Sequence, residues 1–350
     1  MNITKWFRCK YELKKNSMPK YFVMNKNMIP EWSSEIDSNQ YNLFGSIKLK
    51  KDFNQILILG ITNKLEHEII DQVYNINTKT NISILKSNLQ KCIRRSKIKK
   101  AVRTGKLLLD IDPNELLRRL AIIYIEDVMI DNYFNNIVWY MAAVSKGFVL
   151  SSNDKLIILN IIEYLAKSEI KEEIPRIDNL DYNQYFSEMN SDILNYNFNS
   201  IWSLILRSKY GGMKCDIRMI NGALKIYDQK KIKKIELEIT NFDFKLKIKE
   251  KDIILEAIDF HCSKIIGILF KKKKIDYSEN YQIYKKCIWD HRSKITNKII
   301  INETNNNSLI DNQELYESIK DDLDSISKNI IKYQVNLDFA YNKIVRSETD

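Results

Sequence analysis

The amino-acid sequence predicts a mainly α-helical protein with a small mixed α/β part near its N-terminal end. Apolar residues recur at helical spacing through most of 83–168, whereas an isolated apolar run, Ile56–Leu59, lies between Gly45 and Gly60 as a short buried strand would. Only eight glycines and four prolines occur in 350 residues. This scarcity of turn-forming residues excludes collagen-like chains and most turn-dense all-β folds.

Helical spacing is clearest in the region 83–170, which we expect to form a basic helical bundle. Leu85, Leu89, Ile93 and Ala101 share one helical face, so a single basic helix is predicted over about 86–106. Asp112-Pro113 has the residues of a helix start. Further helices are expected through Phe134–Ala142 and Leu156–Leu165, and short loops between them favour antiparallel packing.

The remaining chain divides into three further regions. Residues 1–80 form the small mixed α/β region, 176–300 form an α+β region, and 301–350 form a polar loop and a C-terminal helix. Within 176–300, helices are expected from Ile193 to Lys209 and from Asp252 to Phe270. Period-two alternation predicts a β-hairpin at about 235–249.

The charge balance indicates an acidic partner. The formal net charge is +11 and the pI is near 9.1, as is typical of nucleic-acid-binding proteins. Isoleucine, asparagine and lysine dominate the composition, which also indicates an A/T-rich genome, such as that of a giant virus. With no signal-peptide pattern, no membrane-length apolar run and five scattered cysteines, we expect no membrane association and a reducing intracellular compartment, cytoplasmic or nuclear.

The positive charge is concentrated in one acid-free window. Between Gln72 and Leu109 there is no Asp or Glu, but there are ten lysines and arginines. A compact positive field of this kind suits phosphate contacts. The predicted nucleic-acid-binding residues are Lys86, Lys91, Arg94, Arg95, Lys99, Lys100 and Arg103. A solvated face filled with lysine by codon bias is the alternative interpretation.

Part of this region resembles a known family. The pattern Leu-x-Lys-x-x-Arg in Leu89–Arg94, followed by Asp112-Pro113, Arg118-Arg119 and Glu126-Asp127-Val128, is similar to the helical C-terminal region of clamp-loader-like AAA+ ATPases of the RarA/MgsA type. The resemblance covers about residues 83–168 and implies oligomerisation and work at replication forks. Because the chain lacks a Gly-x-x-x-x-Gly-Lys-Ser/Thr loop, it implies no ATPase activity.

Two constellations suggest ligand or metal chemistry. Tyr210-Gly211-Gly212-Met213 is unusual in a glycine-poor chain, and Arg207, Gly211 and Gly212 form a candidate anion site; a helix end followed by a turn is the plainer interpretation. His261, Cys262, Cys287 and His291 have ligand types that suit zinc, although a buried cysteine and a core histidine explain them better. No cofactor is predicted.

The leading hypothesis is a non-catalytic nucleic-acid-binding protein of replication, repair or transcription, with the 86–106 helix as its contact surface. One alternative is a metal-dependent nuclease or related phosphate-ester enzyme using Asp216, Glu236, Glu238 and His261. The other is a scaffold whose helical bundle binds protein partners or a second copy of itself. No residue is assigned a catalytic role under the leading hypothesis.

Overall fold

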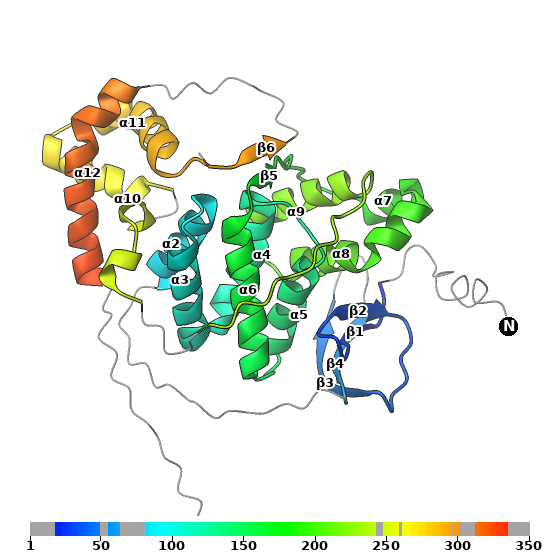
Figure 1. Cartoon of the computed structure of the whole chain (residues 1–350). Helices are drawn as coiled ribbons and strands as arrows, with labels where there is room; N and C mark the ends of the chain where they lie inside the picture. Colours follow the sequence, from blue (N-terminus) through cyan, green and yellow to red (C-terminus); the bar gives the residue numbers. More distant parts are fainter. Residues whose placement is uncertain are drawn as a thin grey trace, which may run out of the picture. The chain divides into compact units, whose positions relative to one another are not determined.

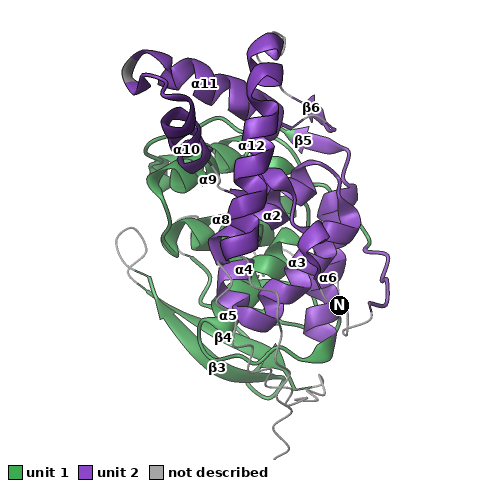
Figure 2. Cartoon of the chain, turned by 90° about the vertical axis from the view of Figure 1, so that its left-hand side faces the viewer, with its two compact units in different colours: residues 1–69, 117–152, 172–236 green, residues 70–116, 153–171, 237–350 purple. Residues whose placement is uncertain are grey.

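The computed structural model describes residues 18–49, 55–63, 82–242, 248–258, 261–295, 297–301 and 312–334. It confirms a mainly α-helical chain with a small sheet near the N-terminal end (Figure 1). The chain forms two compact units, each built from three separate segments (Figure 2). Unit 1 comprises 1–69, 117–152 and 172–236, and unit 2 comprises 70–116, 153–171 and 237–350. The four regions expected from the sequence divide the chain differently and stay a prediction.

The sheet of unit 1 has four strands in the order β2-β1-β4-β3. They are β1 (Tyr21–Met24), β2 (Pro30–Ser33), β3 (Tyr41–Lys48) and β4 (Ile56–Thr62). The apolar run predicted as a strand is β4, where Leu57 and Leu59 are fully buried. β4 pairs in parallel with β1 and antiparallel with β3.

The helices of unit 1 are α4 (Pro113–Asp127, in unit 1 from Leu117), α5 (Phe134–Val144), α7 (Tyr182–Glu188), α8 (Ser191–Lys209) and α9 (Lys214–Tyr227). Two of these helices, α5 and α8, pack against this sheet. α8 packs against α5, α9 and β2, and α5 packs against β1 and β2 (Figure 1). The contact is polar as well as apolar, since Trp139 Nε1 donates to the Phe22 carbonyl oxygen at 3.2 Å.

In its described residues, unit 2 contains helices and one short strand pair. Its elements are α2 (Ile82–Arg94), α3 (Ile98–Ile111), α6 (Ser152–Lys167), β5 (Ile170–Glu172), the short 3-10 helices η1 (Glu250–Asp252) and η2 (Leu255–Ile258), α10 (Ser263–Lys273), α11 (Tyr277–Arg292), β6 (Ile299–Ile301) and α12 (Gln313–Gln334). α2 packs against α3 and η2, and α10, α11 and α12 pack against one another. β5 pairs with β6.

Local helix signals predicted several boundaries well. α4 begins at Pro113, and Asp112 Oδ1 accepts a hydrogen bond from the Glu115 amide at 3.0 Å. α8 ends at Lys209, as predicted, and Asn190 caps its start. None of the described helices is long and apolar enough to cross a bilayer.

Two elements predicted in the C-terminal half of the chain are wrong. The expected helix from Asp252 to Phe270 is interrupted, because Cys262 has φ 61° and α10 begins only at Ser263. The first arm of the expected hairpin, Ile235–Ile239, joins no β-ladder, and most of the second arm lies outside the described residues.

Asparagine side chains replace the missing ladder along this extended chain. In unit 1, Asn132 Oδ1 accepts from the Ile235 amide at 2.7 Å, and Asn132 Nδ2 donates to the Ile235 carbonyl oxygen at 3.3 Å. In unit 2, Asn160 holds the amide and carbonyl of Thr240 in the same way, at 2.7 and 3.1 Å. A side-chain amide has the same donor and acceptor groups as a peptide bond. It can therefore satisfy the backbone N–H and C=O groups of an extended segment that pairs with no other strand.

Candidate nucleic-acid interface

The basic segment predicted as one helix over 86–106 is two helices. α2 ends at Arg94, and Ser96 has φ 54°, a left-handed conformation that an α-helix does not contain. α3 then begins at Ile98 and packs back against α2. The predicted phosphate-binding residues are therefore divided between two helices, and several of them face the packed interior of unit 2.

Lys91 and Arg94 lie in that interior. Their exposed fractions are 2% and 5%. Lys91 Nζ donates to the Glu256 carbonyl oxygen at 2.5 Å, and Arg94 Nη1 donates to the Ser293 carbonyl oxygen at 2.6 Å. The structure thus places both side chains against the backbone of 256–293 rather than toward solvent.

The other predicted cations have partners distant in the sequence. Arg95 pairs with Glu256, Arg103 Nη1 lies 2.9 Å from Asp252 Oδ1, and Lys86 pairs with Glu115. Lys100 Nζ donates to the Lys251 carbonyl oxygen at 2.7 Å, whereas Lys99 is exposed. The segment between Gln72 and Leu109 has no acidic residue of its own, but the fold brings acids from other segments against its cations.

Glu256 shows how closely this charge is compensated. Burial raises the pKa of the Glu256 carboxyl, but the neighbouring Arg95, a backbone hydrogen bond and Arg292 outweigh burial and hold the pKa below its ordinary value. The lysine run Lys271–Lys274 is also partly compensated, since Asp322 Oδ1 and Oδ2 lie 2.6 and 2.9 Å from the ammonium groups of Lys272 and Lys273.

The candidate zinc residues do not form a ligand set. Both ring nitrogens of His291 have partners, the Cys287 carbonyl at 2.8 Å and Gln313 Oε1 at 2.9 Å, and the ring stacks on Tyr316. Cys262 and Cys287 are buried thiols, and His261 is exposed. In the part of the chain that the structure describes, no three His, Cys, Asp or Glu side chains are arranged to hold a metal ion.

The carboxylates considered for a nuclease are also dispersed. Asp216 lies in the first turn of α9, whereas Glu236 and Glu238 are exposed on the extended segment that follows. Among the described residues, none of these three carboxylates belongs to a group of three or more side chains that could hold a metal ion. Without converging carboxylates there is no site for two-metal phosphate-ester chemistry in that set.

The candidate anion site lies between α8 and α9. Gly211 has φ +87° and Gly212 has φ +149°. Arg207, 3% exposed, donates from Nη1 to the Gly211 carbonyl oxygen at 2.8 Å, and its buried Nε has no hydrogen-bond partner among the described groups. A Cβ atom on Gly212 would lie 3.6 Å from Arg207 Nη1 and from Asp216 Oδ2.

Two further arginines bear on this site. Burial lowers the pKa of Arg207 to about 10, Asp216 opposes that change, and the positive charges of Arg118 and Arg119 add to it. Arg118 is exposed on α4 and Arg119 is half-buried. The charges that act on Arg207 therefore come from α4 as well as from α9.

A different basic surface in unit 1 was not predicted. The ammonium groups of Lys231 and Lys234 lie 4.8 and 4.4 Å from the centroid of the Tyr196 ring. Tyr196 is 38% exposed on α8, and Lys231, Lys233 and Lys234 are exposed. We call these four residues the lysine–tyrosine patch.

The lysines of the patch have no carboxylate neutralising them within 4 Å in the described ranges, unlike the cations of α2 and α3. Lys230, the preceding residue, pairs with the buried Glu172 and is excluded from the patch for that reason. Of the nearest acids in the sequence, Asp228 is half-buried and lies 3.6 Å from the Lys225 ammonium group, and Glu236 is exposed. The patch thus retains its charge at the surface, next to an aromatic ring.

Asn197 fixes the chain that carries these lysines. Its Nδ2 donates to the carbonyl oxygens of Tyr227 and Lys230, both at 2.8 Å, and its Oδ1 accepts from the Ile232 amide at 2.8 Å. Asn197 is buried one residue after Tyr196 on α8. A single turn of α8 therefore positions both the aromatic ring and the backbone of the lysine run.

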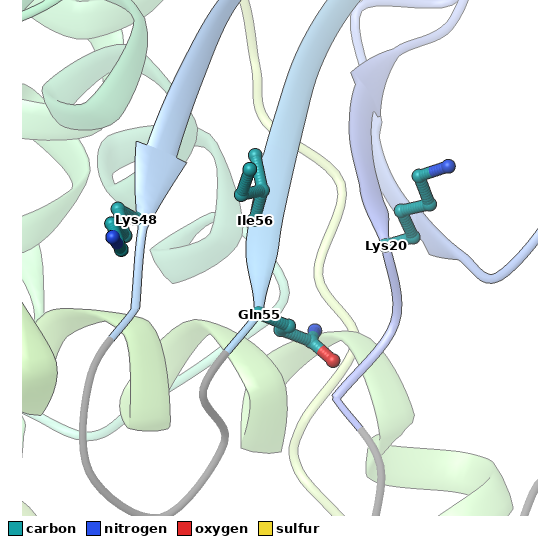
Figure 3. A pocket seen from close by; sticks show the side chains of 4 residues that line it. All are labelled: Lys20, Lys48, Gln55 and Ile56. Carbon is teal, nitrogen blue, oxygen red and sulfur yellow. The ribbon is translucent and has the colours of Figure 1, made fainter.

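A pocket at one end of the sheet offers a third place for a ligand. It is lined by Lys20, Lys48, Gln55 and Ile56. The two lysine side chains point away from each other (Figure 3), and Gln55 Nε2 donates to the Met18 carbonyl oxygen at 2.6 Å. Because its charges do not converge, this pocket is a weaker candidate than the lysine–tyrosine patch.

The chain was compared with protein families, curated proteins and solved structures. No protein-family model, curated protein or solved structure matches the chain. The similarity of 83–168 to the clamp-loader-like ATPases accordingly stays a prediction.

Proposed function

We propose that the protein binds nucleic acid, and that the lysine–tyrosine patch of unit 1, rather than the α2–α3 segment, makes the principal contacts. The observation that carries this proposal is the position of two unneutralised ammonium groups over an exposed tyrosine ring. Lysines supply contacts to phosphates, and an aromatic face supplies a platform on which a base stacks.

The arrangement favours single strands. A base can stack on Tyr196 only if it is unpaired, and every base has a face suited to such stacking. The ammonium groups that lie over the ring in the free protein are on flexible exposed side chains. They can turn to the flanking phosphates while the base takes their place over the ring.

The expected salt dependence follows from the number of lysines. If all three lysines contact phosphates of a single strand, a plot of log affinity against log salt concentration should have a slope of about −2. Affinity should then fall about 20-fold between 50 and 200 mM salt. This is much shallower than the slope expected if all seven predicted residues of the α2–α3 segment met phosphates.

The proposal is tested by titrating the full chain into fluorescent single- and double-stranded oligonucleotides and following anisotropy at several salt concentrations. Tighter binding of single strands with a slope near −2 supports it. Absence of binding at 50 mM salt contradicts it and favours a protein-binding scaffold. Metal-dependent cleavage of the oligonucleotide would instead favour the enzyme.

A further inference from the structure

Arg207 is a buried charge without a counterion in contact. Its side chain is 3% exposed, yet no carboxylate oxygen of the described chain lies within 4 Å of it, and its Nε has no hydrogen-bond partner. Its one hydrogen bond is to the neutral carbonyl of Gly211. A buried guanidinium is costly unless a charged partner and hydrogen bonds compensate it.

The backbone beside Arg207 has donors available as well. Within the described chain, neither Gly211 nor Gly212 donates its amide hydrogen. Both glycines have positive φ, and they precede Met213, the N-cap residue of α9. Consecutive amides in such a turn form an anion-binding concavity, and the helix start adds a favourable dipole.

Charged groups of α4 and α9 act on Arg207. The positive charges of Arg118 and Arg119 on α4 lower the pKa of Arg207, whereas the carboxylate of Asp216 on α9 raises it. Arginine recognises the oxygens of a phosphate with paired N–H donors, so a guanidinium beside the two glycine amides suits such an oxyanion.

We propose that the turn between α8 and α9 is a phosphate-binding site, in which Arg207 and the Gly211–Gly212 backbone hold the phosphate oxygens and the charge of the exposed Arg118 strengthens the attraction. The ligand chemistry is a phosphate dianion, supplied either as the free ion or as the terminal monoester of a nucleic acid. This site is independent of the lysine–tyrosine patch, since it shares no residue with it.

The first arm of the test uses inorganic phosphate. The melting temperature of the full chain is measured in phosphate-free buffer and with increasing phosphate, sodium chloride being adjusted to constant ionic strength. A ligand that binds only the folded state raises the melting temperature in proportion to its occupancy. The second arm compares oligonucleotides that differ only in a 5′-phosphate or a 5′-hydroxyl.

Variants identify the site. Arg118→Gln changes an exposed side chain, so the fold is retained, and Arg207→Met replaces the buried charge by an apolar chain of similar length. Both should weaken the phosphate effect at least tenfold in concentration, whereas Asp216→Asn should strengthen it, because it removes the opposing charge. Lys26→Gln, an exposed cation of the same unit, is the matched control and should change nothing.

A phosphate-specific rise of the melting temperature in the first arm, or tighter binding of the 5′-phosphate oligonucleotide in the second, supports the site if Arg118→Gln weakens that effect at least tenfold. A rise in the first arm alone identifies the free ion, and a 5′-phosphate effect identifies the nucleic-acid end. No effect in either arm, or an effect of the same size in Arg118→Gln and wild type, overturns the proposal. Because Tyr196 and its lysines are intact in these variants, failure here leaves oligonucleotide binding by the patch unchanged.

Discussion

The ammonium group of Lys234 lies 4.4 Å from the centroid of the Tyr196 ring, although 38 positions separate the two residues in the sequence. Lys231 approaches the same ring. Cation–π attraction holds the two ammonium groups over the exposed ring in the free protein. The same groups form a ready contact for an unpaired base and its phosphates.

Replacing the ring should weaken single-strand binding. We expect Tyr196→Ala to lower oligonucleotide affinity about tenfold, because base stacking on an aromatic face contributes about 1 to 3 kcal/mol. Tyr196→Phe should retain most of the affinity. Tyr333→Ala removes another exposed tyrosine, on α12, and serves as the control in the same anisotropy titration. Equal losses in the two alanine variants would contradict a role for Tyr196.

Asn197 should support both stability and binding. Asn197→Ala removes three hydrogen bonds to backbone groups of 227–232 and leaves buried groups unpaired, at a cost of about 2 to 4 kcal/mol. We expect a melting temperature lower by about 3 to 6 °C and weaker oligonucleotide binding at temperatures where the variant is folded. Asn195→Ala, an exposed asparagine of the same helix, should change neither property. If Asn197→Ala destabilises the fold but binds the oligonucleotide as tightly as wild type, the backbone conformation that Asn197 fixes at 227–232 does not matter for binding.

Stability should fall at acidic pH partly through Glu256. Its pKa is lowered in the folded state, so its ionised form stabilises the fold above its ordinary pKa of 4.5, and this contribution is lost as the pH falls through the lowered value. Urea unfolding at a series of pH values should therefore show a steeper acid loss in wild type than in Glu256→Gln. Parallel curves for the two proteins would show that Arg95 does not hold this carboxyl ionised.

Charge reversal in α2 should unfold the protein locally rather than alter a surface. We expect Arg94→Glu combined with Arg95→Glu to cost more than about 3 kcal/mol, because the change places acids in a packed region beside Glu256. Lys97→Glu combined with Lys99→Glu changes only exposed residues and is the control. Circular dichroism melts distinguish the two pairs. If the Arg94→Glu/Arg95→Glu variant is as stable as wild type but no longer binds oligonucleotide, the result would favour the α2–α3 segment as the nucleic-acid interface.

Local signals made part of this fold predictable. The start of α4 at Pro113 follows from the capping chemistry of Asp112, and the buried strand β4 follows from its run of apolar residues. The break at Ser96 was missed because neither glycine nor proline marks it. The hairpin was wrong because Asn132 and Asn160 satisfy the extended chain from outside, which alternation within that chain does not reveal.

The candidate interface depended on contacts between distant positions. Arg95 and Arg103 pair with Glu256 and Asp252, which lie 161 and 149 residues further along the chain. The acid-free window in the sequence therefore overestimates the positive charge left at the surface. The run from Lys230 to Lys234 is visible in the sequence, but its meaning depends on Tyr196, which folding brings alongside it. Arg207, Gly211 and Gly212 were identified correctly as neighbours because they lie within one local turn.

The salt dependence of single-strand binding tests the central claim most directly. Oligonucleotide affinity is measured from 50 to 200 mM salt for wild type and for Lys231→Gln/Lys233→Gln/Lys234→Gln, with Lys271→Gln/Lys274→Gln as the matched control of exposed lysines. We expect the triple variant to lose most of a slope of about −2, because each lysine contributes about 0.7, while the control keeps it. An unchanged slope in the triple variant would contradict the lysine–tyrosine patch as the nucleic-acid interface.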